Sequence, residues 1–233
     1  RGRDYHIVFV GDLVDRGPAS ATVVQTVRRG VEAGRFSCVL GNHDEMFLHA
    51  LILLRPDLVE TAGLDLEEHD ALVDSMRFAP RRVLSHWLGQ GGNATILSYG
   101  GTPARPETWR IPPEDVRFLA TLPLAYRRSD LVVTHARADT VAVEDALRNA
   151  ETPWNVSERN RNRCLWNRSS ATAVETGTHV CGHTPRKRPL RDGRTVEIDT
   201  GCVFDNLLTA YIPDEERYLA VPCGDSTREG GSD

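Results

Sequence analysis

The sequence predicts an α/β fold, because short apolar strand-like runs alternate with helical patterns along its 233 residues. Two observations carry this prediction. Residues 5–44 follow the order strand, helix, strand, which is typical of a parallel βαβ unit. In addition, four separate apolar runs each end in a polar residue that could bind a ligand. Ligands of α/β sheets bind beyond the carboxyl ends of the strands, so these four ends predict one shared site.

The N-terminal βαβ unit can be followed residue by residue. Residues 5–11 (YHIVFVG) are rich in β-branched and aromatic side chains and predict a strand. Pro18 lies where the first turn of a helix accepts proline, and that helix should end near Gly34. Its predicted apolar face consists of Val23, Val24, Val27 and Val31. The run FSCVLGNHD, residues 36–44, predicts the second strand and its polar end.

The middle of the chain predicts a helical excursion over about residues 45–90. Helical patterns appear in EMFLHALILL, in LEEHDALVDSMRFAP (residues 66–80) and in RRVLSHWLG, with a break at Pro56. The glycine-rich segment 89–106 predicts a loop that borders a site. A further helix is expected over residues 112–122, with two prolines at its start.

Short strands return in the last part of the chain. The strand candidates are DLVVTHA (130–136), HVCGHTP (179–185), TVEIDTG (195–201) and NLLTAYIP (206–213). The pair Asp192-Gly193 is a strong signal for a hairpin turn. Residues 223–233 are polar and glycine-containing and predict a disordered tail. We therefore expect a single domain over residues 1–222.

Composition excludes several classes of partner and location. A net charge of −5, spread over many charges of both signs, gives no basic surface for nucleic acid or for anionic membranes. No apolar run approaches the roughly 20 residues that cross a bilayer. The five cysteines are scattered and form no CxxC pair, which predicts structural or inert thiols in a reducing cytosol rather than a disulfide framework. A cytoplasmic protein is expected.

The four strand ends supply a mixed set of oxygen and nitrogen donors. They deliver Asp12 from VFVGD, Asn42 and His43 from VLGNH, His135 from LVVTH and His183 from VCGH. One carboxylate, one amide and two imidazoles suit manganese, iron or zinc better than calcium. Each residue taken alone has a structural explanation, such as Asn42 capping the following helix. Four coincidences in one chain favour a metal site.

These motifs, in their order, resemble those of a known family. GDLVDRG, GNHDEM, VVTHA and CGHTP match the calcineurin-like metallophosphoesterases, and specifically their phosphoprotein phosphatase branch. WLGQGGNAT, LWNR and the segment from GHTPRKRP to NLLTA are similar to bacterial and phage-type (lambda phosphatase-like) serine/threonine phosphatases. The resemblance implies a two-sheet β-sandwich flanked by helices, in four layers of the αββα type.

The resemblance also implies a ligand set for metal ions. Asp12 would bridge two divalent ions, and Asn42, His135 and His183 would complete the shell of one of them. Manganese is the first expectation for the metal, with iron or zinc as alternatives. Two ions about 3.5 to 4 Å apart would clamp a phosphoryl group during in-line displacement.

Catalytic and phosphate-binding roles follow from the same resemblance. His43 would be the general acid that protonates the leaving group, and Asp15 would orient its ring. Arg16 in DRG and Arg168 in WNR would hold the phosphate, since a guanidinium matches two phosphate oxygens.

The sequence departs from the family at one motif. The family has an Asp-x-His pair, usually inside GDIHG, on an earlier strand, and this pair supplies ligands to the second ion. Asp4 and His6 have the right spacing but precede Asp12 on the same strand, so that an extended chain keeps His6 roughly 20 Å away from it. We interpret them as the polar start of the strand. The true pair is expected to be encoded upstream, and this chain alone is expected to hold the second ion poorly.

Three functions remain open on sequence alone. The first is a serine/threonine protein phosphatase, a phosphomonoester hydrolase that uses in-line attack by metal-bound hydroxide. The second is a diadenosine polyphosphate hydrolase, which shares the metal motifs. The third is a catalytically impaired module that binds phosphorylated ligands. The expected partner is a phosphorylated protein or a small phosphoester, and the sequence does not indicate an oligomeric state.

Overall fold

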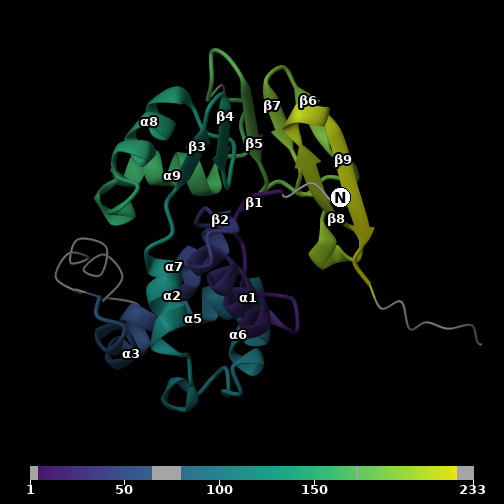
Figure 1. The fold of residues 1–233 in the computed structure, drawn as a ribbon. Coiled ribbons are helices and arrows are strands. Elements are labelled where there is room, and N and C mark those ends of the chain that lie inside the picture. Colours follow the sequence, from purple (N-terminus) through teal and green to yellow (C-terminus); the bar gives the residue numbers. More distant parts are fainter. Residues whose placement is uncertain (1–4, 65–79, 172, 225–233) are drawn as a thin grey trace, which may run out of the picture.

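The first strand, helix and strand form the predicted parallel βαβ unit. β1 (Ile7–Phe9) and β2 (Phe36–Cys38) pair in parallel and are joined by α1 (Ser20–Glu32). In this computed structural model residues 5–64, 80–171 and 173–224 are described (Figure 1). β1 delivers its carboxyl end to the middle of the molecule, between the strands of one half and most of the helices of the other.

The helix α1 differs from the prediction in two details. Val24 and Val27 are buried, but Val23 is 41% exposed because it lies at the edge of the apolar face. The helix begins at Ser20 with Ala19 as N-cap, so Pro18 lies ahead of the helix rather than in its first turn.

The helical excursion is present in the described residues. It contains α2 (Asn42–Leu54), α3 (Pro56–Thr61) and α5 (Pro80–Trp87). Pro56 is the first residue of α3, which confirms the predicted break. The helical stretch predicted over residues 66–80 falls, apart from Pro80, outside the described residues. α2 buries ten of its thirteen residues, because helices pack on one side of it and the strand ends on the other.

The glycine-rich segment predicted as a loop is helical in its first half. The helical turn η2 (Leu88–Gly92) leads into α6 (Asn93–Ser98). Only Gly91, with a φ of 114°, uses a conformation that other residues avoid. Burial of Thr95 and Ile96 stabilises α6 despite its glycine-rich surroundings. The loop prediction was therefore wrong for residues 89–98.

Later helices include one that the sequence predicts and two that it does not. After the turn η3 (Pro106–Thr108), α7 (Pro113–Ala120) confirms the helix expected over residues 112–122. α8 (Thr140–Arg148) and α9 (Glu158–Trp166), with the turn η4 (Pro153–Asn155) between them, are additions. The side chains of Asp139 and Ser157 cap the two helices, which is the signal that could have located them.

Nine strands in the described residues form three hydrogen-bonded sheets. The largest has the order β3-β4-β5-β7-β6, in which β4, β5 and β7 run parallel and both edges are antiparallel. Its strands are β3 (Ala125–Arg128), β4 (Leu131–Thr134), β5 (Thr178–Cys181), β6 (Leu190–Asp192) and β7 (Thr195–Glu197). The hairpin predicted from Asp192-Gly193 is confirmed, and Gly193 and Arg194 are the two residues that join β6 to β7. β8 (Leu207–Ile212) and β9 (Arg217–Pro222) form a separate antiparallel pair.

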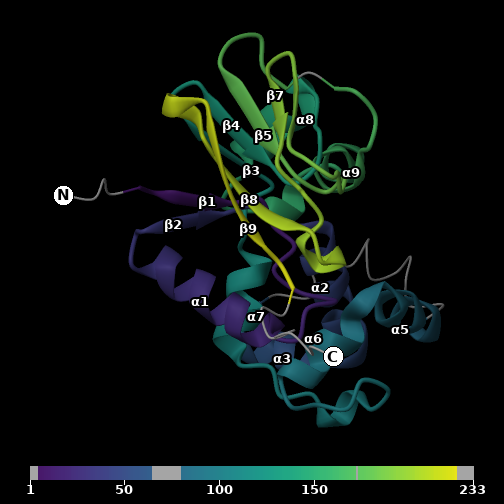
Figure 2. The ribbon, with the colours of Figure 1, turned by 90° about the vertical axis from the view of Figure 1, so that its right-hand side faces the viewer.

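A small apolar core lies between the β1–β2 pair and the large sheet. It consists of Val39, Val133, Val180 and Val196, with Val8 of β1 packed against it. A larger core joins α1, α2, α5, α6 and α7. Figures 1 and 2 place these helices in one half of the molecule and the large sheet with α8 and α9 in the other. This arrangement confirms the predicted α/β sandwich with helices outside.

The cysteine prediction holds for three residues and fails for two. Cys38, Cys164 and Cys181 are buried free thiols, as expected. Cys202 and Cys223 form a disulfide, because the β8–β9 hairpin returns the chain and brings their Cα atoms to 5.1 Å. Cys223 is thus held by the fold, whereas residues 225–233 of the predicted tail lie outside the described residues. Within the described residues, no helix is long and apolar enough to cross a membrane.

Candidate active site

Two glycines allow the ends of β1 and β2 to meet. A Cβ on Gly11 would lie 2.5 Å from the Gly41 nitrogen, and a Cβ on Gly41 would run into the backbone and carboxylate of Asp12. Only glycine fits such a close approach of two backbones. The contact places Asp12 against the first turn of α2, where the His43 amide donates to Asp12 Oδ1 at 3.0 Å.

A buried carboxylate, Asp44, ties these two strand ends together. It accepts hydrogen bonds from the amides of Gly41, Asp12 and Leu13, each at 2.9 Å. Burial, and then the charge of Asp12, raises the pKa of Asp44. Asp44 is not among the site residues predicted from the sequence. Its signal was an acid at the third position of a helix, where a carboxylate can reach back to the N-cap amide.

Three predicted ligand atoms converge on one point. Asn42 Oδ1 lies 2.8 Å from His135 Nε2 and 2.9 Å from His183 Nδ1, and the two ring nitrogens lie 3.2 Å apart. Asp12 Oδ1 lies 3.5 Å from His135 Nε2. Asn42 is the first residue of α2 and Gly41 is its N-cap, so Asn42 does not cap the helix.

Whether the cluster can bind a cation depends on which ring nitrogens of His135 and His183 carry protons. His135 Nδ1 lies 2.7 Å from the Val10 carbonyl, which only accepts, so Nδ1 carries the proton and the Nε2 lone pair faces the cluster. Burial, followed by repulsion from His135, lowers the pKa of His183 to about 4, so this ring is neutral at pH 7. A neutral His183 turns its Nδ1 lone pair to the cluster in the tautomer that carries the proton on Nε2, and the His135 Nε2 lone pair then faces the same point. A cation with bonds of about 2.1 Å in octahedral geometry needs neighbouring donors about 3 Å apart, and the three atoms fit this requirement.

In the described residues, the predicted donors gather in one cluster around Asn42. Among them, no group of three or more His, Cys, Asp or Glu side chains is arranged to hold a metal. The cluster depends on the amide oxygen of Asn42 as its third donor. Asp4 is outside the described residues, and His6 hydrogen-bonds Ser37 at 2.9 Å and stacks on Tyr126. These contacts agree with the polar start of a strand.

His43 and Asp15 form the expected pair. His43 Nδ1 lies 2.6 Å from Asp15 Oδ2, and both side chains are buried. Trp87 Nε1 donates to both carboxylate oxygens at 3.1 Å, and Thr95 Oγ1 donates to Asp15 Oδ1 at 2.7 Å. The sequence did not indicate Trp87 and Thr95 as contributors, although Thr95 lies in the segment 89–106 that was predicted to border a site. A fully hydrogen-bonded carboxylate keeps the proton on His43 Nδ1 and fixes the ring.

Four predicted site residues adopt left-handed backbone conformations. Asp12, Asp15, Arg16 and His183 have φ values of 56°, 74°, 64° and 66°. Such a conformation costs a residue other than glycine about 1 to 3 kcal/mol and persists where its surroundings fix it. Three of these backbones are held by hydrogen bonds from their amides. Asp12 donates to Asp44 Oδ2, Asp15 donates to Thr95 Oγ1 and Arg16 donates to the Gly91 carbonyl.

The two predicted phosphate-binding arginines are exposed near the cluster. The Arg16 guanidinium lies over the Phe204 ring, 5.5 Å from its centroid. Arg168 is close enough to His183 to contribute to lowering the pKa of that ring. Neither guanidinium has an ion-pair partner within residues 5–64, 80–171 and 173–224, so both charges are available to an anion.

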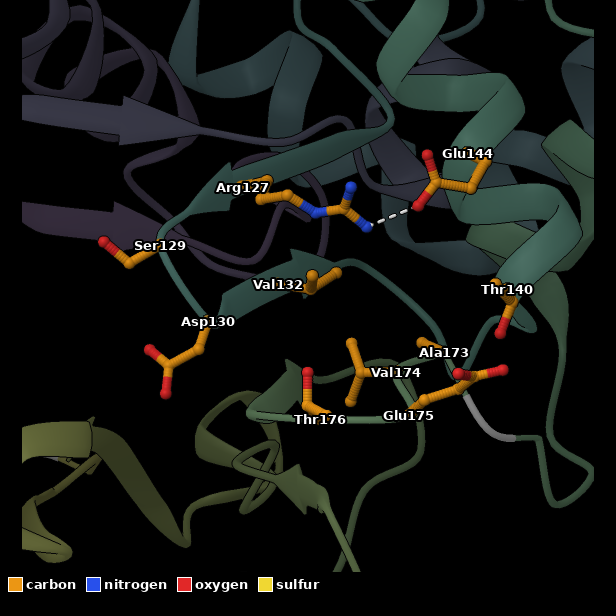
Figure 3. A pocket seen from close by; sticks show the side chains of 10 residues that line it. All are labelled: Arg127, Ser129, Asp130, Val132, Thr140, Glu144, Ala173, Val174, Glu175 and Thr176. Atoms are coloured by element: carbon orange, nitrogen blue, oxygen red, sulfur yellow. Dashed lines mark hydrogen bonds and ion pairs between the residues drawn. The ribbon is translucent and has the colours of Figure 1, made fainter.

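A cavity of about 370 Å³ lies elsewhere, at the amino end of β4 (Figure 3). It is lined by Arg127, Ser129, Asp130, Val132, Thr140, Glu144, Ala173, Val174, Glu175 and Thr176. Arg127 pairs with Glu144 at 2.6 Å across it. None of the predicted site residues lines this cavity, and the candidate site lies at the opposite, carboxyl ends of the strands.

The chain matches the model of a known protein family. The description of the matching family is calcineurin-like phosphoesterase, and the match covers residues 1–194. The chain belongs to the calcineurin-like phosphoesterases. Members of this family use divalent metal ions, which agrees with the cluster of donors at Asn42.

Relatives of this calcineurin-like phosphoesterase carry nucleotide-related names. The asymmetrical bis(5'-nucleosyl)-tetraphosphatase PrpE of Bacillus subtilis (strain 168) is 30% identical over 230 residues, 93% of this chain and 79% of that protein. A symmetrical bis(5'-nucleosyl)-tetraphosphatase of Nitrosospira multiformis is 26% identical, over 93% of this chain and 85% of that protein. A solved structure, provisionally assigned as a diadenosine tetraphosphatase, is 19% identical with a TM-score of 0.47, covering 94% of this chain and 80% of that one.

These names change the order of the expected functions. A phosphoesterase is established by the family, whereas serine/threonine specificity, the first expectation from the sequence, has no support among these relatives. The alternative, hydrolysis of diadenosine polyphosphates, agrees with the relatives better.

Proposed function

We propose that this phosphoesterase is a metal-dependent hydrolase of dinucleoside tetraphosphates. The observation that carries the proposal is the 30% identity, over 93% of this chain, with a relative named for that activity. The geometry adds a cluster of metal donors, a histidine held by a buried carboxylate and two exposed arginines. Together they offer a place for a highly charged phosphate chain.

The metal would be held by Asn42, His135 and His183, with Asp12 at the edge of the cluster. Mn²⁺ is the proposed ion, with iron or zinc as alternatives, because the donors are one amide oxygen and two imidazoles. When bound, a divalent ion neutralises phosphoryl charge and acidifies water. His183 is neutral at pH 7, so its Nδ1 can bind the ion in the tautomer that carries the proton on Nε2.

His43 would protonate the leaving oxygen of the substrate. Asp15 holds a proton on His43 Nδ1, which leaves the Nε2 side of the ring for exchange with the substrate. Positioned proton donation of this kind contributes about 10² to 10⁴ in rate. Trp87 and Thr95 keep Asp15 in place, so that the ring is oriented before the substrate arrives.

Arg16 and Arg168 would neutralise and orient the phosphate chain. Each phosphate of a tetraphosphate bridge carries negative charge, so one metal ion leaves several charges to be matched. Guanidinium groups bind two phosphate oxygens at once and keep their charge at any working pH. Both side chains are exposed, and neither guanidinium forms an ion pair with a described residue.

The test compares substrates on the same protein. The 233-residue chain, and the same chain with any residues that its gene encodes ahead of Arg1, are incubated with Mn²⁺ and either diadenosine tetraphosphate or a phosphoserine peptide. Chromatography separates the nucleotides: ADP alone indicates symmetrical cleavage, and ATP with AMP indicates asymmetrical cleavage. We expect kcat/KM for the dinucleotide to exceed that for the peptide at least tenfold. A higher kcat/KM for the peptide would restore the protein phosphatase assignment.

A matched pair of variants tests the site itself. Arg168→Ala should raise KM for diadenosine tetraphosphate, whereas Arg29→Ala, which removes an exposed arginine from α1, should leave it unchanged. If both forms of the chain bind the dinucleotide but neither hydrolyses any substrate, the chain is instead a binding module for phosphorylated ligands.

A further inference from the structure

An exposed aromatic ring lies beside the phosphate-binding region. The turn η5 (Cys202–Phe204) follows β7 and presents Phe204 with 59% of its surface exposed. The Arg16 guanidinium lies 5.5 Å from the centre of this ring. A single exposed apolar side chain needs no explanation by itself. Its contact with an arginine of the candidate site makes this one informative.

The turn that carries Phe204 is fixed at both ends. Gly201 before it and Asp205 after it adopt left-handed conformations, with φ of 70° and 59°. The Phe204 amide donates to the Gly201 carbonyl at 2.9 Å, and the Asp205 amide donates to the Cys202 carbonyl at 3.0 Å. The Cys202–Cys223 disulfide attaches the turn to the end of β9. The ring is therefore presented without the entropy cost of ordering a mobile loop on binding.

The same turn is anchored to the candidate site. Asp199 Oδ1 accepts from the Gly201 amide at 2.9 Å. The charge of Asp12 acts on Asp199 in the same direction as burial, raising the pKa of Asp199. A Cβ added at Gly182, the residue before His183, would lie 3.7 Å from the Asp199 Cβ, so Asp199 links the turn that carries Phe204 to the loop that carries a metal donor.

The other exposed aromatic near the site has a different arrangement. Trp166 is 39% exposed, but its ring stands edge-on to His183 at 6.1 Å and its Nε1 donates to Glu45 at 3.2 Å. The indole thus packs against a metal donor and hydrogen-bonds a buried carboxylate. Phe204, in contrast, has the Arg16 guanidinium as its aromatic-face contact and a largely exposed surface.

We propose that Phe204 is a nucleobase-stacking platform, which binds the base of a nucleotide whose phosphates lie on Arg16. This inference rests on the proposed function and adds the part of the substrate that the metal cluster does not recognise. Stacking on a phenyl ring accepts any base, because every base has a π-face. The platform therefore predicts a preference for nucleotides over bare phosphates, with little discrimination between adenine and guanine.

The experiment compares two triphosphate ligands, one with a nucleoside and one without. Titration calorimetry with Mn²⁺ measures the dissociation constants of ATP and of inorganic tripolyphosphate, and chromatography after each titration checks that both ligands are intact. The wild type should bind ATP about tenfold or more tightly than tripolyphosphate, the size expected for one stacked base. Phe204→Ala should remove this preference and leave tripolyphosphate binding unchanged. Phe204→Trp should keep or increase it.

Val203→Ala serves as the matched control, since it shortens an exposed side chain on the same turn. It should leave both dissociation constants unchanged. Equal weakening of both ligands by Phe204→Ala would mean that the ring only positions Arg16, and would overturn the platform. So would a wild type with no preference for ATP. If the wild type hydrolyses diadenosine tetraphosphate but Phe204→Ala leaves its KM unchanged, the platform fails while the proposed function stands. If the wild type hydrolyses only the phosphopeptide, the proposed function itself fails.

Discussion

Asp15 is the most completely hydrogen-bonded charge at the candidate site. One carboxylate oxygen is shared by His43 and Trp87, and the other by Thr95 and Trp87. Burying a charged carboxylate without such donors would reduce the free energy of unfolding by several kcal/mol, so the surrounding side chains favour the charged form of Asp15. At the scale of the single residue, the chemistry of His43 therefore depends on the charge of Asp15.

Asp15→Asn should lower kcat by about 10² to 10⁴ while changing KM little, because the amide cannot hold the proton on His43 Nδ1 as a carboxylate does. The loss should be larger for an alkyl phosphate than for p-nitrophenyl phosphate, whose leaving group needs no proton. Asp57→Asn, at an exposed acid that pairs with Arg55, is the control and should leave both rates intact. An equal loss with both substrates would exclude a role in proton donation.

Replacing His135 and His6 in turn distinguishes a metal ligand from a structural histidine. The chain, freed of metal with a chelator, should take up one Mn²⁺, and His135→Ala should weaken that affinity at least tenfold, because His135 Nε2 faces the other donors. His6→Ala should have no effect, because His6 bonds Ser37 on β2. Electron paramagnetic resonance of free Mn²⁺ measures the Mn²⁺ affinity of both variants. A comparable loss with His6→Ala would place His6 in the metal site.

At the scale of elements, the site depends on how closely two strand ends approach. The backbones of Gly11 and Gly41 touch, and this contact allows β1 and α2 to share the hydrogen bond between Asp12 and His43. The N-terminus of α2, whose His43 amide donates to Asp12, then lies at the cluster with its positive dipole end, which favours negative charge. Metal ligands and phosphate-binding residues are thus brought together by one contact between backbones.

Gly41→Ala should destabilise the chain by about 1 to 3 kcal/mol and abolish tight Mn²⁺ binding, because the added Cβ meets the backbone of Asp12 rather than a side chain that can move. Gly89→Ala is the control. Its Cβ meets no atom within 4 Å, so the variant should be unchanged or slightly more stable. Urea denaturation gives both values. A Gly41→Ala chain with normal stability and normal Mn²⁺ affinity would show that the close approach is not required.

The elements that could be predicted are those whose pattern is local. β1, β2 and the ends of β4 and β5 are apolar runs followed directly by polar residues, so both the strand and its ligand are adjacent in sequence. α9 was missed because its sequence, ERNRNRCLW, has no apolar period and buries Arg161 through long-range contacts. The segment 89–98 was predicted as a loop because it is rich in glycine, although among its glycines only Gly91 adopts a positive φ.

The residues missed at the candidate site have roles that depend on tertiary contacts. Asp44 and Thr95 act on backbone or carboxylate groups that come from distant parts of the chain. The Cys202–Cys223 bridge likewise depends on the return of the β8–β9 hairpin. No sequence pattern reports such distances. The predicted donors, in contrast, share one sheet edge and were found because strand ends converge by topology.

At the scale of the whole molecule, a buried histidine makes stability depend on pH. Thr134 donates its hydroxyl hydrogen to the Ala136 carbonyl, so His179 Nε2 must donate to Thr134 Oγ1. Burial, and then the charge of Arg137, lowers the pKa of His179 to about 4. An unfolded histidine has a pKa of about 6.5, so the unfolded chain binds a proton between these values that the folded chain does not. Stability is therefore full above pH 6.5 and falls as the pH drops towards 4.

His179→Gln should reduce this loss, because glutamine can still donate to Thr134 but does not titrate. Between pH 7 and pH 5 the metal-free wild type should lose about 2 kcal/mol through His179, with a similar loss through His183. The variant should lose about 2 kcal/mol less over the same range. Urea denaturation in the presence of a chelator measures the difference, and His86→Gln, at an exposed histidine of α5, is the control. Parallel pH profiles for His179→Gln and wild type would contradict the assignment.

Because the Asp44 carboxylate joins amides from both strand ends, the two loops cannot open independently of each other. Hydrogen–deuterium exchange should then show the amides of Asp12, Leu13 and Gly41 opening with one common free energy. The Asp44→Asn variant, with one acceptor oxygen fewer, should split this unit into separate rates, whereas independent exchange in the wild type would contradict the coupling. Metal added to the intact chain should slow all three amides together, so the ion would register as a local folding ligand even where no substrate is turned over.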